Sequence, residues 1–101
     1  MLVLVIDDEQ AIRQVLSVAL SRGGYEVEQA GTVGEASARL ARGDIDIAIC
    51  DIKLPDGNGI DLVKSARASG LDTAFLFLTA FASMETAVEA LRAGAADYMT
   101  K

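Results

Sequence analysis

The sequence predicts an α/β domain in which an open, five-stranded parallel sheet carries helices on both faces. Apolar segments that suit buried strands alternate along the chain with segments whose apolar residues recur at helical spacing. Strands separated by helices pair in parallel through right-handed crossovers. The chain has 101 residues, enough for one domain and too few for an eight-stranded barrel. We therefore expect residues 1–101 to form a single doubly wound domain.

The sequence pattern is clearest for the first predicted strand and the helix that follows it. Leu2–Ile6 is a run of β-branched residues and leucine, which is typical of a strand buried on both faces. Apolar residues at helical spacing predict a helix over residues 10–21, and two glycines end it. Residues 25–30 then alternate in polarity, which indicates an edge strand.

The middle of the chain repeats the pattern and adds a turn. Thr32 and Glu35 form a capping box that begins a helix running through Ala41. Residues 45–50 are apolar except for Asp46 and predict the third strand. Residues 54–59 are rich in turn-forming residue types. We interpret them as a turn and not a calcium loop, because the acidic ligands that such a loop needs are missing.

The last part of the chain is predicted to contain two more helices and two more strands. A short helix covers residues 60–68, and Ala74–Thr79 is the most apolar of the predicted strands. Ser83 is the expected cap of the fourth helix, which Gly94 ends. Residues 97–101 begin the fifth strand.

Composition excludes several kinds of site. The chain contains no histidine and one cysteine, Cys50, so it has neither a histidine-based nucleophilic site nor an internal disulfide. The net charge of −6 argues against direct nucleic acid contact. No apolar run is long enough to span a membrane, and the acids after the first strand do not suit a signal peptide. A cytoplasmic location is the expectation.

Polar residues gather at one edge of the predicted sheet. The carboxyl ends of the strands carry Asp7, Asp8 and Glu9 after the first, Asp51 after the third, Thr79 in the fourth and Lys101 in the fifth. Crowded carboxylates repel one another unless a cation lies between them, and Mg²⁺ prefers such oxygen ligands. One carboxylate could then accept a phosphoryl group, with the lysine and the hydroxyl stabilising its charge. The pattern indicates phosphoryl chemistry.

Each of these residues also has a structural interpretation when it is considered alone. The acids could favour a helix N-terminus, Asp51 could belong to a turn, and Thr79 could simply suit a strand. Tyr98 could be a half-buried aromatic, and Lys101 a solvated lysine. Only their joint placement favours a functional site.

Four segments together resemble a known family. They are residues 5–9 with the acidic pair, 50–59 around Asp51, 78–80 around Thr79, and 94–101 with the final lysine. In this order they resemble the CheY-like receiver domain of two-component response regulators. Residues 79–98 are most similar to the receivers of NtrC-type transcription activators.

The resemblance implies a fold and a role for each site residue. The fold would be flavodoxin-like, with strand order 2-1-3-4-5. Asp51 would accept the phosphoryl group, and Lys101 would contact it. Mg²⁺ would be bound by Asp7, Asp8, Asp51 and the backbone carbonyl of Lys53. Thr79 and Tyr98 would form a coupled switch.

The resemblance also implies a function with external partners. A sensor histidine kinase would donate the phosphoryl group, and the signal would pass to an output domain or partner protein that regulates transcription. The domain itself would not be an enzyme beyond the chemistry on Asp51. Two alternatives are an aspartate-nucleophile phosphohydrolase and a pseudo-receiver that works without phosphorylation. Lys53 stands where the phosphohydrolase would need a second acid.

Receivers of this family normally continue past the final lysine with a fifth helix. We therefore expect a truncated receiver, or one that completes its sheet by forming a homodimer. Without that helix, part of the sheet over Leu2–Ile6 and residues 75–78 should lie open as an apolar patch.

Overall fold

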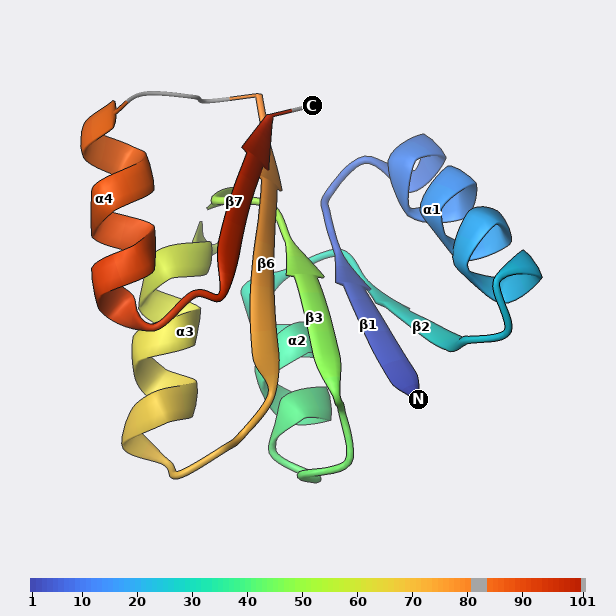
Figure 1. Ribbon diagram of the computed structural model, residues 1–101, viewed down its shortest axis with the longest axis horizontal. Coiled ribbons are helices and arrows are strands. Elements are labelled where there is room, and N and C mark those ends of the chain that lie inside the picture. The colour runs from blue at the N-terminus through green and yellow to red at the C-terminus, as the bar shows by residue number, and fades with distance from the viewer. Residues whose placement is uncertain (81–83, 101) are drawn as a thin grey trace.

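The computed structural model describes residues 1–80 and 84–100. Its main sheet has five parallel strands in the order β2-β1-β3-β6-β7 (Figure 1). The strands are β1 (Leu2–Ile6), β2 (Glu26–Ala30), β3 (Ile47–Cys50), β6 (Ala74–Thr79) and β7 (Asp97–Thr100). Counted along the chain without the small hairpin described below, this is the order 2-1-3-4-5. The predicted fold class is therefore confirmed.

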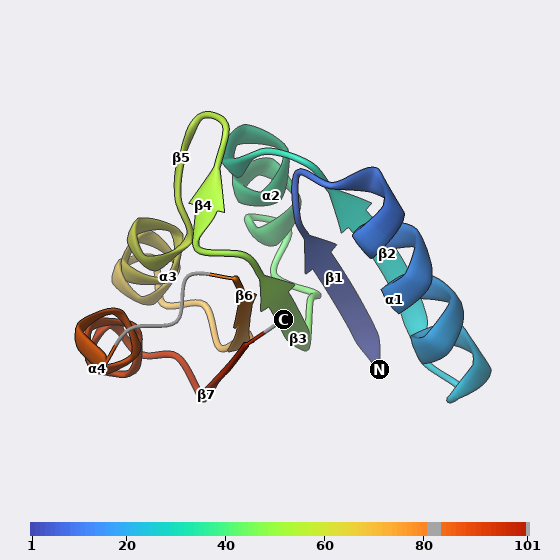
Figure 2. The same ribbon diagram turned by 90° about the horizontal axis from the view of Figure 1, so that it is seen from above.

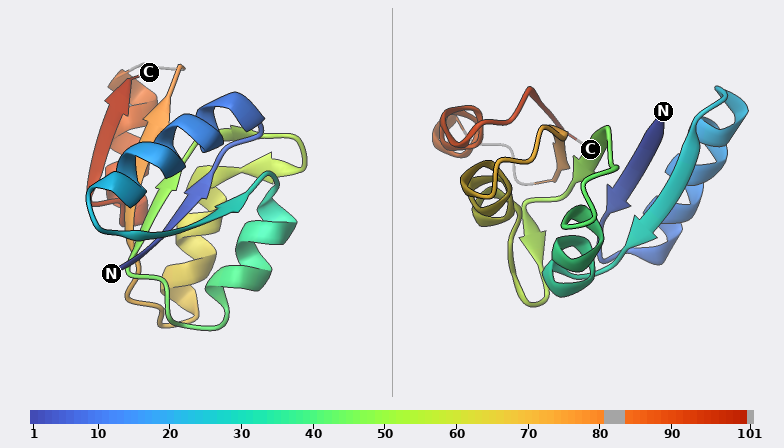
Figure 3. Two further views of the ribbon diagram at one scale, coloured as in Figure 1. Left: turned by 90° about the vertical axis from the view of Figure 1, so that its right-hand side faces the viewer. Right: turned by 90° about the horizontal axis from the view of Figure 1, so that it is seen from below.

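The helices divide unequally between the two faces of the sheet. They are α1 (Gln10–Arg22), α2 (Val33–Leu40), α3 (Gly59–Ala68) and α4 (Met84–Ala93). Seen from above, α2, α3 and α4 lie on one side of the sheet and α1 lies on the other (Figure 2). The left view of Figure 3 shows α1 alone in front of the sheet. Within the described residues no fifth helix shares this face with α1, as expected.

A two-stranded antiparallel hairpin forms where the sequence indicated only a turn. It consists of β4 (Lys53–Leu54) and β5 (Gly57–Asn58), with Pro55 and Asp56 at its tip. The buried Leu54 side chain explains why these residues do not remain an open loop. The hairpin stands directly after Asp51 and beside α2 (Figure 2).

Element boundaries differ slightly from those predicted. The third strand begins at Ile47 and not at residue 45, because the ladder to β1 starts there, although Ile45 is buried. The second helix ends at Leu40, with Ala41 as its C-cap. The Thr32 cap is confirmed, since its hydroxyl accepts a hydrogen bond of 3.1 Å from the Glu35 amide. The predicted Ser83 cap lies outside the described residues.

The core lies between the sheet and helices α2, α3 and α4. Phe75 and Phe77 of β6 are fully buried against Leu40, Ile60 and Val63 from the helices. Each such side chain contributes roughly 1.5–3 kcal/mol by leaving water. This packing fixes the strands whose carboxyl ends carry the polar residues.

The opposite face of the sheet is only partly covered. No residue of α1 is buried, and the exposed fractions of Val15 and Val18 are 68% and 48%. An apolar groove of about 320 Å³ runs between α1 and Leu78 of β6. The sequence analysis predicted that this open patch would extend over the first strand, Leu2–Ile6, in addition to residues 75–78. The prediction for the first strand is wrong. The residues Val3–Ile6 are at most 1% exposed, because α1 covers β1.

No helix within the described ranges combines the length and the apolar character that crossing a membrane requires.

Candidate functional site

Two buried aspartates meet where β1 and β3 end. The Asp51 amide donates a hydrogen bond of 2.9 Å to the carbonyl of Ile6, so the parallel pairing continues one residue beyond the strands. This places Asp51 beside Asp7 in the adjacent strand end. Their exposed fractions are only 7% and 3%. Buried carboxylates need compensation from hydrogen bonds or a cation.

Asp8 completes a cluster of three carboxylates. It follows Asp7 in the loop before α1 and is exposed. One carboxylate oxygen from each of Asp7, Asp8 and Asp51 lies within 4.8 Å of the others. Three convergent oxygens, one of them open to water, suit a hard divalent cation that keeps part of its hydration shell. The sequence predicted this convergence.

Asp7 is held by contacts that leave its orientation little freedom. Its amide donates to the carbonyl of Ala30 at 3.1 Å, and its Oδ1 accepts from the Glu9 amide at 3.0 Å. Arg13 of α1 donates from Nη1 to the Asp7 carbonyl at 2.6 Å. We did not predict a role for Arg13, because its place in the helix is equally compatible with solvent exposure. The contact depends on how α1 packs on the sheet.

The backbone around Asp51 is packed tightly against Gly59, the first residue of α3. A Cβ atom built on Gly59 would collide with the Asp51 carbonyl and would lie 2.9 Å from a ring carbon of Phe77. The Gly59 amide donates to the Ile52 carbonyl at 2.7 Å. The Cys50 thiol is buried on the same side, and desolvation, followed by the charges of Asp51 and Asp7, raises its pKa well above the ordinary value. Cys50 is therefore a neutral packing residue.

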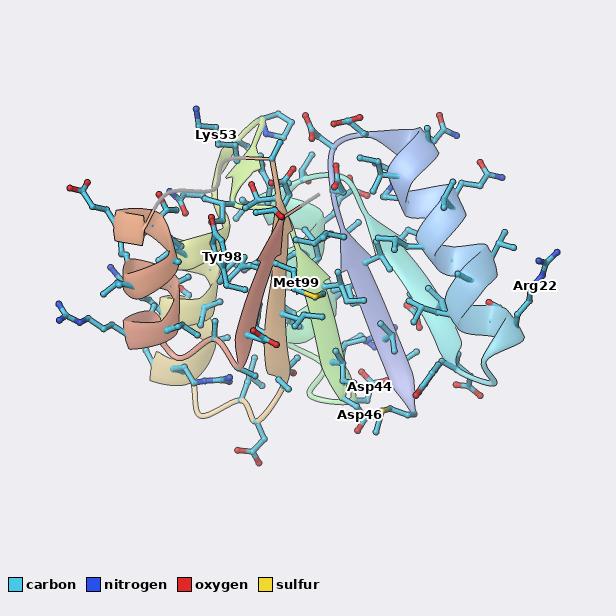
Figure 4. The ribbon with its side chains drawn as sticks, turned by 45° about the horizontal axis from the view of Figure 1, so that its top comes forward. Arg22, Asp44, Asp46, Lys53, Tyr98 and Met99 are labelled. Atoms are coloured by element: carbon cyan, nitrogen blue, oxygen red, sulfur yellow. The ribbon has the colours of Figure 1, made fainter. Side chains whose placement is uncertain are left out.

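The hairpin after Asp51 carries Lys53 and Asp56. The Lys53 side chain is exposed at the top of the molecule in Figure 4. The Asp56 carboxylate accepts hydrogen bonds from the amides of Val33 at 2.7 Å and Gly34 at 3.0 Å, at the start of α2. These two bonds hold the pKa of Asp56 below its ordinary value. The sequence indicated only a turn residue here, and no local signal connects Asp56 with α2.

The remaining predicted residues lie on the two strands beyond β3. Thr79 ends β6 and is fully buried, two register positions past Phe77, which pairs with Cys50. Tyr98 lies on β7, half-buried against the core (Figure 4). Lys101 follows Thr100, which pairs with Thr79. Its own position lies outside the described residues.

Comparison with known proteins identifies the family. The sequence model of the response regulator receiver domain matches residues 3–101. The chain is a response regulator receiver domain. It is a signalling domain and not an enzyme of the kind that turns over substrates.

Several curated relatives of this receiver are named as transcriptional regulators. It is 41% identical over 98 residues to the response regulator protein PilR of Pseudomonas aeruginosa, and 37% identical over 99 residues to the DNA-binding transcriptional regulator NtrC of Rhizobium meliloti. These matches cover 97% and 98% of this chain. The receiver spans only 22% and 20% of the lengths of those two proteins. The predicted resemblance to NtrC-type receivers is confirmed.

Solved structures show the same fold. The receiver superposes with a TM-score of 0.92 on the beryllofluoride-activated NtrC4 receiver domain dimer, at 31% identity, covering 99% of this chain and 83% of that one. A CheY-like receiver from Methanospirillum hungatei gives a TM-score of 0.93 at 37% identity, covering 99% and 80%. Both likenesses extend over nearly the whole chain.

Proposed function

We propose that this receiver is a phosphorylation-operated switch with Asp51 as the phosphoacceptor. The observation that carries the proposal is the position of Asp51. Its buried carboxylate lies at the end of a central strand and within 4.8 Å of the oxygens of Asp7 and Asp8. A nucleophilic carboxylate in such surroundings is protected from bulk water and has a place for a counter-cation beside it.

The three aspartates fit a magnesium ion, and we propose Mg²⁺ as the cofactor. Asp7, Asp8 and Asp51 would hold it together with the backbone carbonyl of Lys53, which belongs to the hairpin directly after the phosphoacceptor. When bound, the ion would neutralise charge on the transferred phosphoryl oxygens. Arg13 supports this site by fixing the Asp7 carbonyl.

The transfer step follows from the chemistry of a phosphohistidine donor. A carboxylate oxygen of Asp51 attacks phosphorus and forms the new P–O bond. The P–N bond of the donor breaks, and its electron pair stays on the imidazole, which takes a proton. Lys101 would contact the transferred group, and the Thr79 hydroxyl would donate to one of its oxygens.

The switch itself would couple Thr79 to Tyr98. Thr79 ends β6, and Tyr98 lies on the neighbouring strand β7. Phosphorylation would stabilise the conformation in which the hydroxyl approaches the phosphoryl group and the ring of Tyr98 turns inward. The face formed by α4 and β7 would then present a changed surface to the output partner.

The proposed partners are a sensor histidine kinase and a transcriptional output domain. Because the chain has no histidine, the phosphohistidine must belong to another protein or domain. The similarity to PilR and NtrC supports an output in transcription. The net charge of −6 supports contact with proteins and not with nucleic acid by this domain, and we propose a cytoplasmic location.

Replacing the phosphoacceptor provides the direct test. We expect the wild-type chain to gain one phosphoryl group from acetyl phosphate with Mg²⁺, and Asp51→Asn to gain none. Intact mass spectrometry measures the modification. Asp72→Asn is the matched control, because Asp72 is an exposed aspartate at the opposite end of β6 and should leave labelling unchanged.

Other outcomes would favour the alternatives. Labelling of Asp51→Asn at the wild-type rate would contradict the assignment of Asp51. Multiple turnover of a generic phosphoester would favour a phosphohydrolase. Failure of the wild type to bind Mg²⁺ in a calorimetric titration would favour a phosphorylation-independent pseudo-receiver.

We propose, finally, that the open face beside α1 is covered in the functional protein. The exposed Val15 of α1 and the groove at Leu78 form an apolar surface that favours association. The occupant would be a fifth helix from the chain beyond Lys101 or a second copy of the domain.

A further inference from the structure

The hairpin β4–β5 is bonded to a helix that is distant in sequence. The Asp56 carboxylate uses both of its oxygens, accepting from the Val33 amide at 2.7 Å and the Gly34 amide at 3.0 Å. Behind it, a Cβ atom on Gly57 would lie 3.1 Å from a methyl carbon of Val33, so the hairpin backbone lies directly against the start of α2. The hairpin and the helix therefore form one packed unit (Figure 2).

The two hydrogen bonds that Asp56 accepts are together stronger than an ordinary surface contact. The first amides of a helix lack partners within the helix, and the helix dipole favours a negative charge there. A carboxylate that accepts two such amides makes two charge-assisted hydrogen bonds. The helix already has its own cap in Thr32, whose hydroxyl accepts from the Glu35 amide at 3.1 Å. Asp56 thus adds a bond that α2 does not need in order to begin.

What Asp56 adds is a fixed position for the hairpin. The base of the hairpin is held by the Ile52 carbonyl, which accepts from Gly59, and the strands pair Lys53 with Asn58. These contacts keep the hairpin closed but do not set its tilt relative to the sheet. Leu54 packs beneath it, and Asp56 fixes its exposed tip.

We propose that Asp56 is a positioning residue for the metal site. By tying the hairpin tip to α2, it holds the backbone carbonyl of Lys53 at a fixed place relative to Asp7, Asp8 and Asp51. This inference rests on the proposed function, in which that carbonyl is a Mg²⁺ ligand. The ligand is a backbone atom, so its direction depends entirely on how the hairpin is held.

A metal titration with a matched control tests the role of Asp56. We compare Asp56→Ala with Thr32→Ala, because each removes a side-chain acceptor from the N-terminus of α2 and only the first releases the hairpin. The probe is Mg²⁺ alone, without any phosphodonor, measured by isothermal titration calorimetry. We expect Asp56→Ala to weaken Mg²⁺ binding by about tenfold, as loss of an outer-shell support does elsewhere. Thr32→Ala should bind Mg²⁺ like the wild type.

A conservative variant and a thermal melt complete the experiment. Asp56→Asn keeps an oxygen that can accept one of the two amides, so we expect its affinity to lie between those of wild type and Asp56→Ala. Melting in EDTA shows whether the variants are folded and equally destabilised. In Mg²⁺, the rise in melting temperature should be smaller for Asp56→Ala than for Thr32→Ala.

The outcomes separate this inference from the proposed function. In one outcome the wild type binds Mg²⁺, and Asp56→Ala and Thr32→Ala have equal affinities, whether both are normal or both are weakened. This result would overturn the role of Asp56 and leave the metal site standing. If Asp56→Ala fails to fold, the comparison uses Asp56→Asn instead. A wild-type affinity for Mg²⁺ in both Asp56→Asn and Thr32→Ala would then overturn the role of Asp56. Absence of Mg²⁺ binding by the wild type would overturn both proposals.

Discussion

At the scale of single residues, the position of Asp51 depends on a glycine that carries no functional group. Gly59 lies so close to the Asp51 carbonyl that no side chain fits between them, and Cys50 Sγ stands 3.0 Å from where a Cβ would be. The atoms it would meet are backbone, a ring and a buried sulfur, and none of them can move cheaply. The position of Asp51 therefore depends partly on the absence of a side chain at Gly59.

The substitution Gly59→Ala should reveal this dependence. We expect the free energy of unfolding to fall by about 1–3 kcal/mol through overpacking, and phosphorylation by acetyl phosphate to slow as the Asp51 backbone shifts. Urea denaturation measures the first effect and mass spectrometry the second.

Gly34→Ala serves as the control for Gly59→Ala. Gly34 lies in helix α2, and its added Cβ would meet nothing nearer than 3.5 Å, an ordinary contact with Asp56. Its stability should be unchanged or raised by up to about 1 kcal/mol, because alanine suits a helix better than glycine does. Equal losses in the two variants would show that Gly59 has no special packing role.

At the scale of elements, an ion-pair network joins β2 to α2 away from the site. Arg39 of α2 donates to Glu28 of β2 at 2.8 Å through Nη2 and to Asp44 at 2.6 Å through Nη1. The hydrogen bond from Arg39 lowers the pKa of both Glu28 and Asp44. The edge strand is thus attached to the helix by charge as well as by its ladder to β1.

The ion-pair network should affect how the stability of the protein changes as the pH falls. Carboxyl groups whose pKa is lowered by folding stabilise the protein above their unfolded pKa, and this contribution is lost as the pH falls through the folded value. We expect Arg39→Gln to melt at a lower temperature near neutral pH and to lose less of its stability than wild type between about pH 5 and about pH 3. Thermal melts across that range measure the slope.

Arg22→Gln is the comparison for this prediction. Arg22 is an exposed arginine at the end of α1 (Figure 4), a helix on the other side of the sheet from α2 (Figure 2). Its substitution should leave the acid slope unchanged. If the slope of Arg39→Gln matches that of wild type, the two carboxylates contribute nothing to acid stability.

The elements themselves were predictable where a pattern is local. Helices and strands with clear periodicity, and the Thr32 capping box, are where the sequence placed them. The β4–β5 hairpin was not predictable, because two residues on each side of a turn are too few to show a strand period. Asp56 and its partner Val33 are 23 residues apart, and a bond across that separation has no local signature.

At the scale of the whole molecule, the site was predictable for a topological reason. The strands of a parallel sheet end at one edge, so acids that follow β1 and β3 must meet there whatever the details of packing. This argument brings Asp7 and Asp51 together from sequence alone. It does not find Arg13, whose contact depends on how α1 crosses the sheet. Nor could it show that α1 covers β1 and leaves the open face over β6.

The uneven cover of the sheet leads to a prediction about association. The apolar surface of α1 and β6 includes Val15, whose exposed fraction is 68%. We expect the 101-residue chain alone to form dimers through this face. Val15→Lys should raise the dissociation constant by about a hundredfold, since each of the two copies loses the burial of a valine, worth roughly 1.5 kcal/mol. Sedimentation equilibrium measures the constant.

A second lysine substitution tests whether the face is specific. Leu91 is 49% exposed on α4, which covers the opposite side of the sheet. Leu91→Lys should leave the dissociation constant unchanged. A wild-type chain that stays monomeric at every concentration would contradict the dimer and favour cover by a further helix.

The buried thiol of Cys50 has a practical consequence. It is the one cysteine of the chain, it is fully buried next to Asp51, and its raised pKa keeps it protonated. A cysteine attacks an alkylating reagent only when its thiol is deprotonated and accessible, so the folded domain is inert to such reagents. Modification can proceed only through openings of the core between the sheet and α3. The rate of alkylation therefore measures how often those openings occur beside Asp51, the proposed phosphoacceptor.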